Sequence, residues 1–434
     1  MPIPTTALKL ADSLASALGL LDRRFAVDEL IRAARRRTGL EDFGDVDIGE
    51  PLRRFLDSCV DDSCLSLVGR FATRWDVVRF LSNLLLLRAA ERAHPDILAE
   101  PVAQPIFIAG LPRSGTTFLH RMMLEDPANR GPLVYETIYP CPPPSGQPDR
   151  RAAQVARQLR TFNQLAPEFF GLHPLEATSP QECSEITAHV FRSLRFDTNY
   201  HLPSYRAWLD ADPVGHEPAY RFHRRFLQHL QHQAGDHAVP RWVLKCPDHL
   251  FALDAIRAVY PDARLVFVHR DPVKVLLSVA KLTEVVRRPF TRRLDPVAIG
   301  QEESDRWEQG TQRMMAVGDD AGLPEPVCHV HHLDLVSDPV ATVEQVYGHF
   351  GLALPTAAAK AMERYVAAQP NGGYGRHDYH FADHGLNAEA ERKKFRGYML
   401  RFGISPESQG SHVPAAPAGV GREADQRGER SEAG

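Results

Sequence analysis

The stretch that decides the fold is Ile106-Phe-Ile-Ala-Gly110-Leu-Pro-Arg113-Ser114-Gly115-Thr116-Thr117. Its first part is a short apolar run that ends at Gly110, which is the pattern of a buried strand. A helical stretch over residues 116–124 follows the loop. Glycines that permit a tight turn, followed by the free N–H groups of a helix start, form a cradle that favours an anion. The stretch therefore predicts a phosphate-binding loop between a strand and a helix.

The loop resembles the Walker A motif GxxxxGK[ST] but departs from it at one position. Thr116 stands where that motif has its lysine, and the cation sits earlier, at Arg113. A guanidinium is planar and always charged, so it can grip an oxyanion through two hydrogen bonds. The hydroxyls of Thr116 and Thr117 add further donors. We therefore expect a phosphate-bearing ligand, and the missing lysine disfavours an ordinary P-loop kinase or NTPase.

Short apolar runs alternate with helical patterns on the C-terminal side of this loop. The expected strands, each paired with the helix that follows it, are 242–245 with 254–260, 265–268 with 272–282, and 328–333 with 339–350. Such alternation predicts an α/β fold, with a P-loop-type core in which a central parallel sheet is flanked by helices.

We expect the chain of 434 residues to divide into three parts. Residues 1–100 carry apolar residues at helical spacing and form an N-terminal helical region. The α/β core covers residues 101–404, with a helical insertion at about 135–235 that interrupts the rhythm of strands. Residues 405–434 are rich in small and charged residues and have no aromatic residue, so we expect a disordered tail there.

The bulk composition excludes several classes of function. The formal net charge of −4 gives no overall basic field, so we expect no nucleic-acid partner. No apolar run is long enough to span a bilayer. The six cysteines form no CxxC pair, which predicts reduced thiols in a cytoplasmic protein and no metal site. The sequence leaves open the oligomeric state and any peripheral association with a membrane.

A second stretch, Leu265-Val-Phe-Val-His-Arg270-Asp-Pro272, runs on to Ser278 and carries a family resemblance together with the loop. The two stretches resemble the nucleotide signatures of sulfotransferases that use 3'-phosphoadenosine-5'-phosphosulfate (PAPS). The resemblance implies that Arg270 and Ser278 hold the 3'-phosphate. It implies that the 5'-phosphosulfate is held by Arg113, Ser114, Gly115, Thr116 and Thr117. An arginine at a strand's carboxyl end and a serine on the next helix converge at the sheet edge where α/β ligands bind.

Other segments extend the resemblance over about residues 20–404, within the bacterial branch that has an N-terminal helical extension. By this resemblance, Lys245 contacts the transferring group, while Arg376 and Tyr379 belong to a C-terminal loop that contacts the nucleotide. The sequence departs from the family pattern at Cys246 and at His331-His332. We expect both departures to affect the choice of acceptor and to leave the phosphate signatures untouched.

Sulfuryl transfer is an in-line displacement that needs donors around the equatorial oxygens, a cation at the bridging oxygen and a base for the acceptor proton. Two residues are candidates for the base: Glu136, which resembles the family's catalytic glutamate, and His249, four residues after Lys245. We favour Glu136, because burial can tune a carboxylate toward neutral pH. Glu182 and Glu185 form a weaker group, since their segment has the pattern of a helix start.

The function expected from the sequence is therefore transfer of a sulfuryl group from PAPS, without a metal, to a hydroxyl or amine. The acceptor is expected to be a small molecule, a lipid or a glycan. Aromatic residues are expected to shape its pocket together with the N-terminal helices, namely Phe162, Phe169, Phe170, Tyr200, Tyr205 and Trp208. The alternative is another P-loop nucleotide-binding protein, either a kinase or NTPase or a regulator without catalysis.

Overall fold

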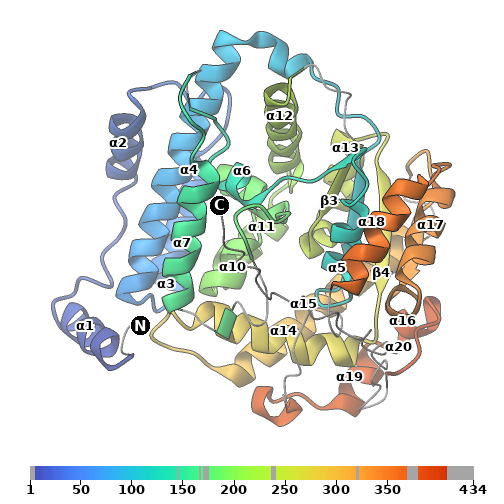
Figure 1. The fold of residues 1–434 in the computed structure, drawn as a ribbon. Coiled ribbons are helices and arrows are strands. Elements are labelled where there is room, and N and C mark those ends of the chain that lie inside the picture. Colours follow the sequence, from blue (N-terminus) through green and yellow to red (C-terminus); the bar gives the residue numbers. More distant parts are fainter. Residues whose placement is uncertain are drawn as a thin grey trace, which may run out of the picture.

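The structure, a computed structural model, describes residues 5–143, 146–165, 168–169, 175–235, 241–318, 322–368 and 380–407. Its centre is a sheet of five parallel strands in the order β2-β3-β1-β4-β5 (Figure 1). The strands are β1 (Ile106–Gly110), β2 (Asn129–Arg130), β3 (Arg241–Lys245), β4 (Arg264–His269) and β5 (Cys328–His331). The fold is therefore α/β, as the alternation of strands and helices predicted.

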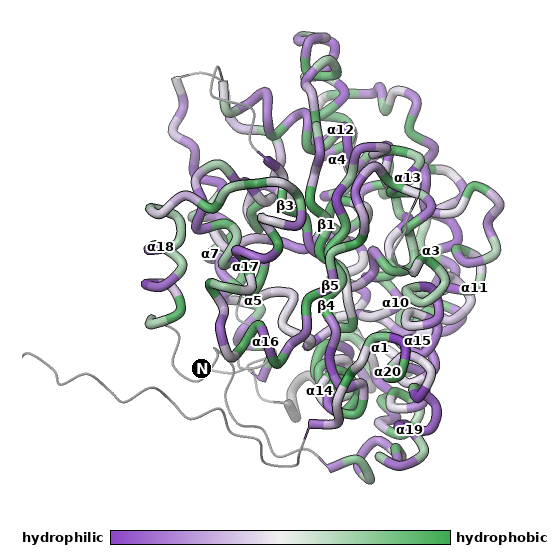
Figure 2. Tube along the Cα trace, turned by 90° about the vertical axis from the view of Figure 1, so that its right-hand side faces the viewer, coloured by the Kyte–Doolittle hydropathy of each residue, from purple (hydrophilic) through white to green (hydrophobic). Residues whose placement is uncertain are grey.

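Strand β1 lies between β3 and β4 at the centre of the sheet. In its register, Ile108 pairs with Lys245 of β3, and Gly110 pairs with Val268 of β4. Every residue of β1 is buried, because helices cover both faces of the parallel sheet. Figure 2 colours this strand mostly green, the colour of hydrophobic residues. The chain passes from β3 across β1 to β4, and such a switch point opens a ligand crevice at the carboxyl ends of the strands.

Helices on both faces bury alternate residues of β1. Ile106 and Ile108 belong to one apolar cluster, and Phe107 and Ala109 belong to another. The helices of the core are α5 (Thr116–Met123), α13 (Leu253–Val259), α14 (Pro272–Arg287), α15 (Pro296–Val317), α16 (His332–Ser337), α17 (Pro339–His349), α18 (Thr356–Ala367), α19 (Ala388–Lys394) and α20 (Arg396–Arg401), with the 3-10 helices η3 (Pro247–Phe251) and η5 (Phe381–His384).

The expected strands and helices of the core match the structure closely, with two differences. The predicted strand 328–333 ends at His331, because His332 begins helix α16. Strand β2 was not predicted, since two residues give no readable periodicity.

The N-terminal region is helical, as predicted. Its elements are α1 (Thr5–Ala17), α2 (Val27–Thr38), α3 (Gly49–Asp61), α4 (Leu67–Ala93) and η1 (Pro95–Ala99). The hydroxyl of Ser66 caps α4 by accepting a hydrogen bond from the N–H of Gly69 at 2.9 Å. A Cβ on Gly69 would lie 2.1 Å from the carbonyl oxygen of Phe290, so only glycine lets α4 pass this close to the end of α14.

The segment between β2 and β3 is also helical, as the sequence indicated. Its elements are α6 (Val134–Ile138), α7 (Arg151–Leu165), α9 (Ser184–Thr187), η2 (Ala188–Val190), α10 (Arg195–Tyr200), α11 (Pro203–Ala211) and α12 (Glu217–Gln233). Helix α4 packs against η2, and α3 packs against α11, so the insertion and the N-terminal helices form one connected part of the molecule.

The structure describes only the first three residues of the tail that we expected to be disordered. Residues 405–407 have a defined place at the sheet edge, where the N–H of Glu407 donates to a carboxylate oxygen of Asp271 at 2.9 Å. Residues 408–434 lie outside the described part of the chain. All six cysteines are free thiols. Among the helices that the structure describes, none is both long and apolar enough to cross a bilayer.

Candidate active site

Glycines at both ends shape the loop between β1 and α5. A Cβ on Gly110 would lie 2.5 Å from the carbonyl oxygen of Val268 in the neighbouring strand, so this position requires glycine. Gly115 has a φ of 98°, and its Cβ would meet Nδ1 of His332 at 3.0 Å. Arg113 also has a positive φ, of 63°, which costs energy in a residue with a side chain. Backbone strain of this kind, next to a helix start, is typical of a ligand-binding loop.

The interior of the loop is held by hydrogen bonds to its own backbone. The hydroxyl of Ser114 donates to the carbonyl oxygen of Leu111 at 2.6 Å. Nδ1 of His332 lies 3.1 Å from the carbonyl oxygen of Ser114 and must be the donor, since a carbonyl only accepts. Burial, together with the nearby charge of Arg270, lowers the pKa of His332 to about 4. Our expectation that His331-His332 leaves the phosphate loop untouched is therefore wrong, because His332 supports that loop directly.

The two signature stretches meet in space, although the residues in contact are 157 positions apart in sequence. Nη1 of Arg270 donates to the carbonyl oxygen of Arg113 at 2.6 Å. Nε of Arg113 donates to the hydroxyl of Ser278 at 3.0 Å. Asp271 caps helix α14 by accepting from the N–H of Val273 at 3.0 Å, which fixes the turn that follows β4. Both guanidiniums and Ser278 line the same cavity.

In this structure, the guanidinium of Arg270 binds a carboxylate of the protein itself. Glu407 accepts two hydrogen bonds from this guanidinium, from Nε at 2.9 Å and from Nη2 at 3.0 Å. Burial raises the pKa of Glu407, but hydrogen bonding and charge from Arg270 outweigh it and lower the pKa overall. The geometry is that of a bidentate anion contact, in which Arg270 presents two N–H donors to one oxyanion.

A lysine and a carboxylate lie next to the loop. Nζ of Lys245 donates to the hydroxyl of Thr117 at 3.0 Å and lies 2.6 Å from a carboxylate oxygen of Glu182. The side chain of Lys245 is 4% exposed, whereas Glu182 is 29% exposed and lines the cavity. The sequence ranked Glu182 as a weaker candidate for the base, because its segment has the pattern of a helix start, and helix α9 begins two residues later. The structure therefore brings a cation and a candidate base together at the loop.

The two bases expected from the sequence lie elsewhere. The carboxylate of Glu136 accepts from the N–H of Leu133 at 2.9 Å and pairs with Arg130 at 3.1 Å, so it caps helix α6. His249 is fully buried, with Nδ1 at 2.5 Å from the hydroxyl of Tyr220. Burial holds the pKa of His249 well below its ordinary value. Neither Glu136 nor His249 is part of the cavity lining.

The cavity has a volume of about 1290 Å³ and extends from the loop to helix α4. Its aromatic lining consists of Phe71, Trp75, Phe118, Phe162, Phe169, Tyr200, Phe290 and Trp307. The expected pocket residues Phe162, Phe169 and Tyr200 are therefore in place. Tyr205 and Trp208 are not part of the lining, because they pack together in the neighbouring core. Phe170 lies outside the described residues.

Comparison with known proteins assigns this arrangement to a family. Residues 105–356 match the model of the sulfotransferase family. The chain belongs to that family. Sulfotransferase STF1 from Mycobacterium tuberculosis is 32% identical, with a TM-score of 0.74 over 86% of this chain and 99% of that structure. Sulfotransferase STF9 from Mycobacterium avium is 26% identical, with a TM-score of 0.78 over 88% of this chain and 98% of that structure.

The name of one relative, from Mycobacterium bovis, states the acceptor of that enzyme. It is the omega-hydroxy-beta-dihydromenaquinone-9 sulfotransferase Stf3, which is 23% identical over 294 residues. The match covers 66% of this chain and 70% of the relative.

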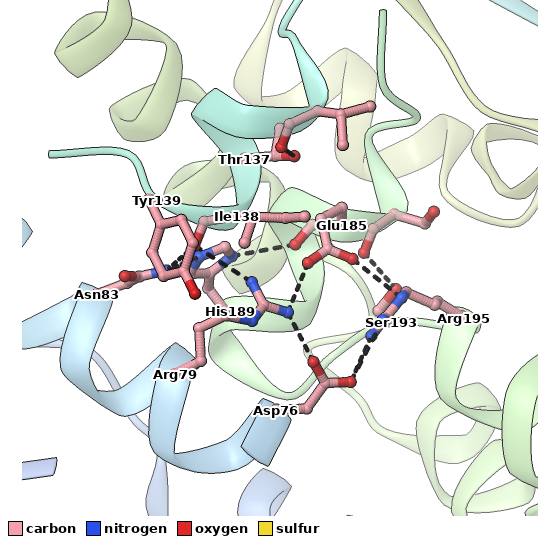
Figure 3. Close-up of polar contacts among 12 residues, drawn as sticks. Asp76, Arg79, Asn83, Thr137, Ile138, Tyr139, Glu185, His189, Ser193 and Arg195 are labelled. Carbon is pink, nitrogen blue, oxygen red and sulfur yellow. Dashed lines mark hydrogen bonds and ion pairs between the residues drawn. The ribbon is translucent and has the colours of Figure 1, made fainter. Parts of the chain in front are cut away.

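In this sulfotransferase, four charged side chains form part of the cavity wall (Figure 3). Nη2 of Arg79 contacts Asp76 at 2.8 Å and Glu185 at 2.7 Å. Arg195 contacts the same two carboxylates, Glu185 at 3.0 Å and Asp76 at 3.3 Å. Two cations balance two anions, so the cluster adds no net charge to the wall. It links α4 to α9 and α10 and thereby fixes the N-terminal helices to the insertion.

Arg79→Ala is expected to lower the free energy of unfolding by about 3–5 kcal/mol, because it removes one of two cations that balance buried carboxylates. Urea unfolding followed by circular dichroism measures this change. The control is Arg54→Ala, which removes an exposed pair with Glu50 and is expected to cost below about 0.5 kcal/mol. If the two variants lost equal stability, the buried cluster would have no special structural role.

Sequence reasoning missed Asp248, which lines the cavity three residues after Lys245. Its carboxylate accepts from Nη2 of Arg306 at 2.9 Å. Burial raises the pKa of Asp248 to about 6, against the opposing charge of Arg306. The local sequence gives no sign of this environment, since Arg306 comes from a distant helix.

Arg376 and Tyr379 fall outside the described residues, so their nucleotide contacts stay predictions. The sequence predicted no metal site. The structure places ligand atoms of His94, Asp96 and His232 within 4.8 Å of one another, and none of these residues lines the cavity.

Proposed function

We propose that this sulfotransferase moves a sulfuryl group from PAPS to a hydroxyl group of a lipid-like acceptor. The observation that carries the proposal is the single cavity lined by both guanidiniums, Arg113 of the loop and Arg270 after β4. A ligand with anionic groups at two places can contact both. PAPS has such groups, a 5'-phosphosulfate and a 3'-phosphate on one nucleoside.

The residues at the loop fit the 5' end of this donor. Gly115 is the N-cap of α5, whose first N–H groups favour an anion. Arg113, Thr116 and Thr117 line the cavity at the same place. When bound, PAPS supplies an activated sulfuryl group on a phosphate leaving group. Arg270 would hold the 3'-phosphate through the two donors that now contact a carboxylate.

Lys245 and Glu182 are the residues that we assign to the transfer itself. Lys245 contacts the hydroxyl of Thr117 and stabilises the negative charge that develops on the leaving phosphate oxygen. Glu182 faces the cavity and takes the proton of the acceptor hydroxyl. The acceptor oxygen forms its bond to sulfur while the bond from sulfur to the phosphate oxygen breaks. Glu182 takes the place of Glu136 and His249 as our candidate, because those two residues do not face the cavity.

The size and lining of the cavity favour a lipid-like acceptor over a glycan. A volume of about 1290 Å³ accommodates a long apolar molecule. Burial of hydrocarbon against Phe162, Tyr200 and Phe290 contributes about 25 cal/mol per Å² of apolar surface. The Mycobacterium bovis relative is named for a hydroxylated menaquinone derivative, which has the same combination of a hydroxyl and an apolar body.

Incubation of the purified enzyme with sulfur-labelled PAPS and a lipid extract tests this function. We expect a labelled lipid whose mass exceeds that of its precursor by one sulfuryl group. Magnesium-dependent ATP hydrolysis without sulfuryl transfer would instead support a P-loop NTPase. Binding of the nucleotide without transfer to any component of the extract would support a regulator.

Glu407→Gln is expected to lower the dissociation constant of adenosine 3',5'-bisphosphate (PAP) about fivefold, because the amide competes less for Arg270 than the carboxylate does. Isothermal titration calorimetry measures the affinity. Glu363→Gln, an exposed change on α18, is the control and is expected to bind PAP as the parent does. Weaker binding by Glu407→Gln would mean that this carboxylate orients Arg270 for the ligand instead of competing with it.

A further inference from the structure

An exposed apolar stripe runs along helix α1. Leu10, Leu14 and Leu18 recur every four residues and are 64%, 60% and 69% exposed. The opposite side of the helix packs against the protein, where Ala15 is 5% exposed. A surface helix of a globular protein normally turns its apolar stripe toward the core. The stripe of Leu10, Leu14 and Leu18, along α1 and the residue after it, is instead turned outward to solvent.

A second exposed apolar stripe lies on the first turns of helix α4. Leu67, Phe71 and Trp75 share the same spacing of four residues and are 36%, 77% and 38% exposed. Phe71 and Trp75 also line the cavity. The second stripe therefore continues from the solvent into the cavity that we assign to the acceptor.

The helices that carry the two stripes contact each other. A carboxylate oxygen of Asp12 accepts from the N–H of Leu67, the first residue of the second stripe, at 2.7 Å. Ser16 of α1 accepts a hydrogen bond from Arg292, in the segment after α14, at 3.0 Å. Figure 1 shows α1 beside the N-terminal end of α4. The stripes and the opening of the cavity therefore lie at one end of the molecule.

Exposed arginines accompany this apolar surface. Arg74 lies on α4 between Phe71 and Trp75, Arg23 follows α1, and Arg293 lies between α14 and α15. Within the described residues, none of the three arginines forms an ion pair with an acidic side chain. Apolar side chains with arginines beside them match the acyl chains and anionic headgroups of a membrane surface.

We propose that these two stripes dock the enzyme on an anionic lipid bilayer, so that the acceptor enters the cavity directly from the membrane. The inference rests on the proposed function, because it gives the route of the lipid-like acceptor. A second copy of the chain is the competing occupant.

Flotation with lipid vesicles tests the docking. The enzyme is expected to float with vesicles of phosphatidylglycerol and phosphatidylcholine, and weakly with phosphatidylcholine alone. Leu14→Glu/Leu18→Glu is expected to lower the partition coefficient about tenfold, because charged groups replace side chains that enter the interface. Leu400→Glu, on α20 and 71% exposed, is the matched control and is expected to float like the parent. Arg23→Glu/Arg293→Glu is expected to remove the preference for phosphatidylglycerol.

Activity separates a failure of docking from a failure of the proposed function. For Leu14→Glu/Leu18→Glu, sulfation of a water-soluble hydroquinone is expected to be unchanged, while sulfation of an acceptor within vesicles falls about tenfold. If the enzyme floats with neither kind of vesicle but still transfers a sulfuryl group to soluble acceptors, the proposed membrane docking is overturned and the proposed function stands. Flotation without any transfer would overturn only the function. A dimer in light scattering that Leu14→Glu/Leu18→Glu dissociates would assign the surface to a second copy and overturn the proposal.

Discussion

Glu182→Gln is expected to lower kcat about 10²–10⁴-fold, because it removes the carboxylate that receives the acceptor proton. The amide has nearly the same shape and still accepts a hydrogen bond from Lys245, so the loop keeps its geometry. The affinity for PAP is therefore expected to change less than about threefold. Initial rates at saturating PAPS, together with calorimetric titration of PAP, separate the two effects.

Glu136→Gln is the matched control for this prediction. Its side chain is expected to keep the cap of α6, since an amide oxygen also accepts from the N–H of Leu133. Because Glu136 does not line the cavity, kcat is expected to stay within about threefold of the parent. The opposite pattern, with turnover lost in Glu136→Gln and kept in Glu182→Gln, would restore Glu136 as the base and refute our assignment.

Arg270→Ala is expected to weaken PAP binding about 10²–10³-fold, because a phosphate in a partly buried site loses a bidentate cation. Binding of adenosine 5'-monophosphate is expected to change far less, since this nucleotide has no 3'-phosphate. The difference between the two nucleotides isolates the contact that we assign to Arg270. Calorimetric titration of both nucleotides into the same variant gives this comparison directly.

Arg270→Lys is the conservative variant for the same contact. It keeps the positive charge but loses the planar pair of donors that now holds the Glu407 carboxylate. We therefore expect an affinity for PAP between those of the parent and Arg270→Ala. Equal losses for PAP and for adenosine 5'-monophosphate in Arg270→Ala would mean that Arg270 maintains the loop through Arg113 and does not bind the 3'-phosphate.

The sheet and the phosphate loop were predictable because their signals are local. Strand β4 contains the unbroken apolar run Leu265-Val-Phe-Val268, and a parallel strand that is buried on both faces needs such a run. The loop between β1 and α5 was recognisable from its glycines and from the cation between them. Arg270 and Ser278 were identified by the family resemblance, and their positions agree with it, since a strand end and the first turns of the next helix converge on one edge of the sheet.

The carboxylates and the histidine of the site were not predictable, because their roles depend on distant partners. Glu182 lies 63 positions before Lys245, and only the fold brings the two together. His332 supports the loop from 218 positions away. Glu136 matched a family pattern, but its carboxylate accepts a hydrogen bond from the N–H of Leu133 and pairs with Arg130. Local sequence cannot distinguish a carboxylate that caps a helix from one that faces a substrate.

A crystal structure of the protein with bound PAP tests the central claim most directly. We predict the 5'-phosphate at the N-terminus of α5 beside Arg113. We predict the 3'-phosphate on Nε and Nη2 of Arg270 and on the hydroxyl of Ser278, with Glu407 displaced. PAP bound while Glu407 still occupies Arg270, or with its two phosphates outside the cavity shared by Arg113 and Arg270, would contradict the account.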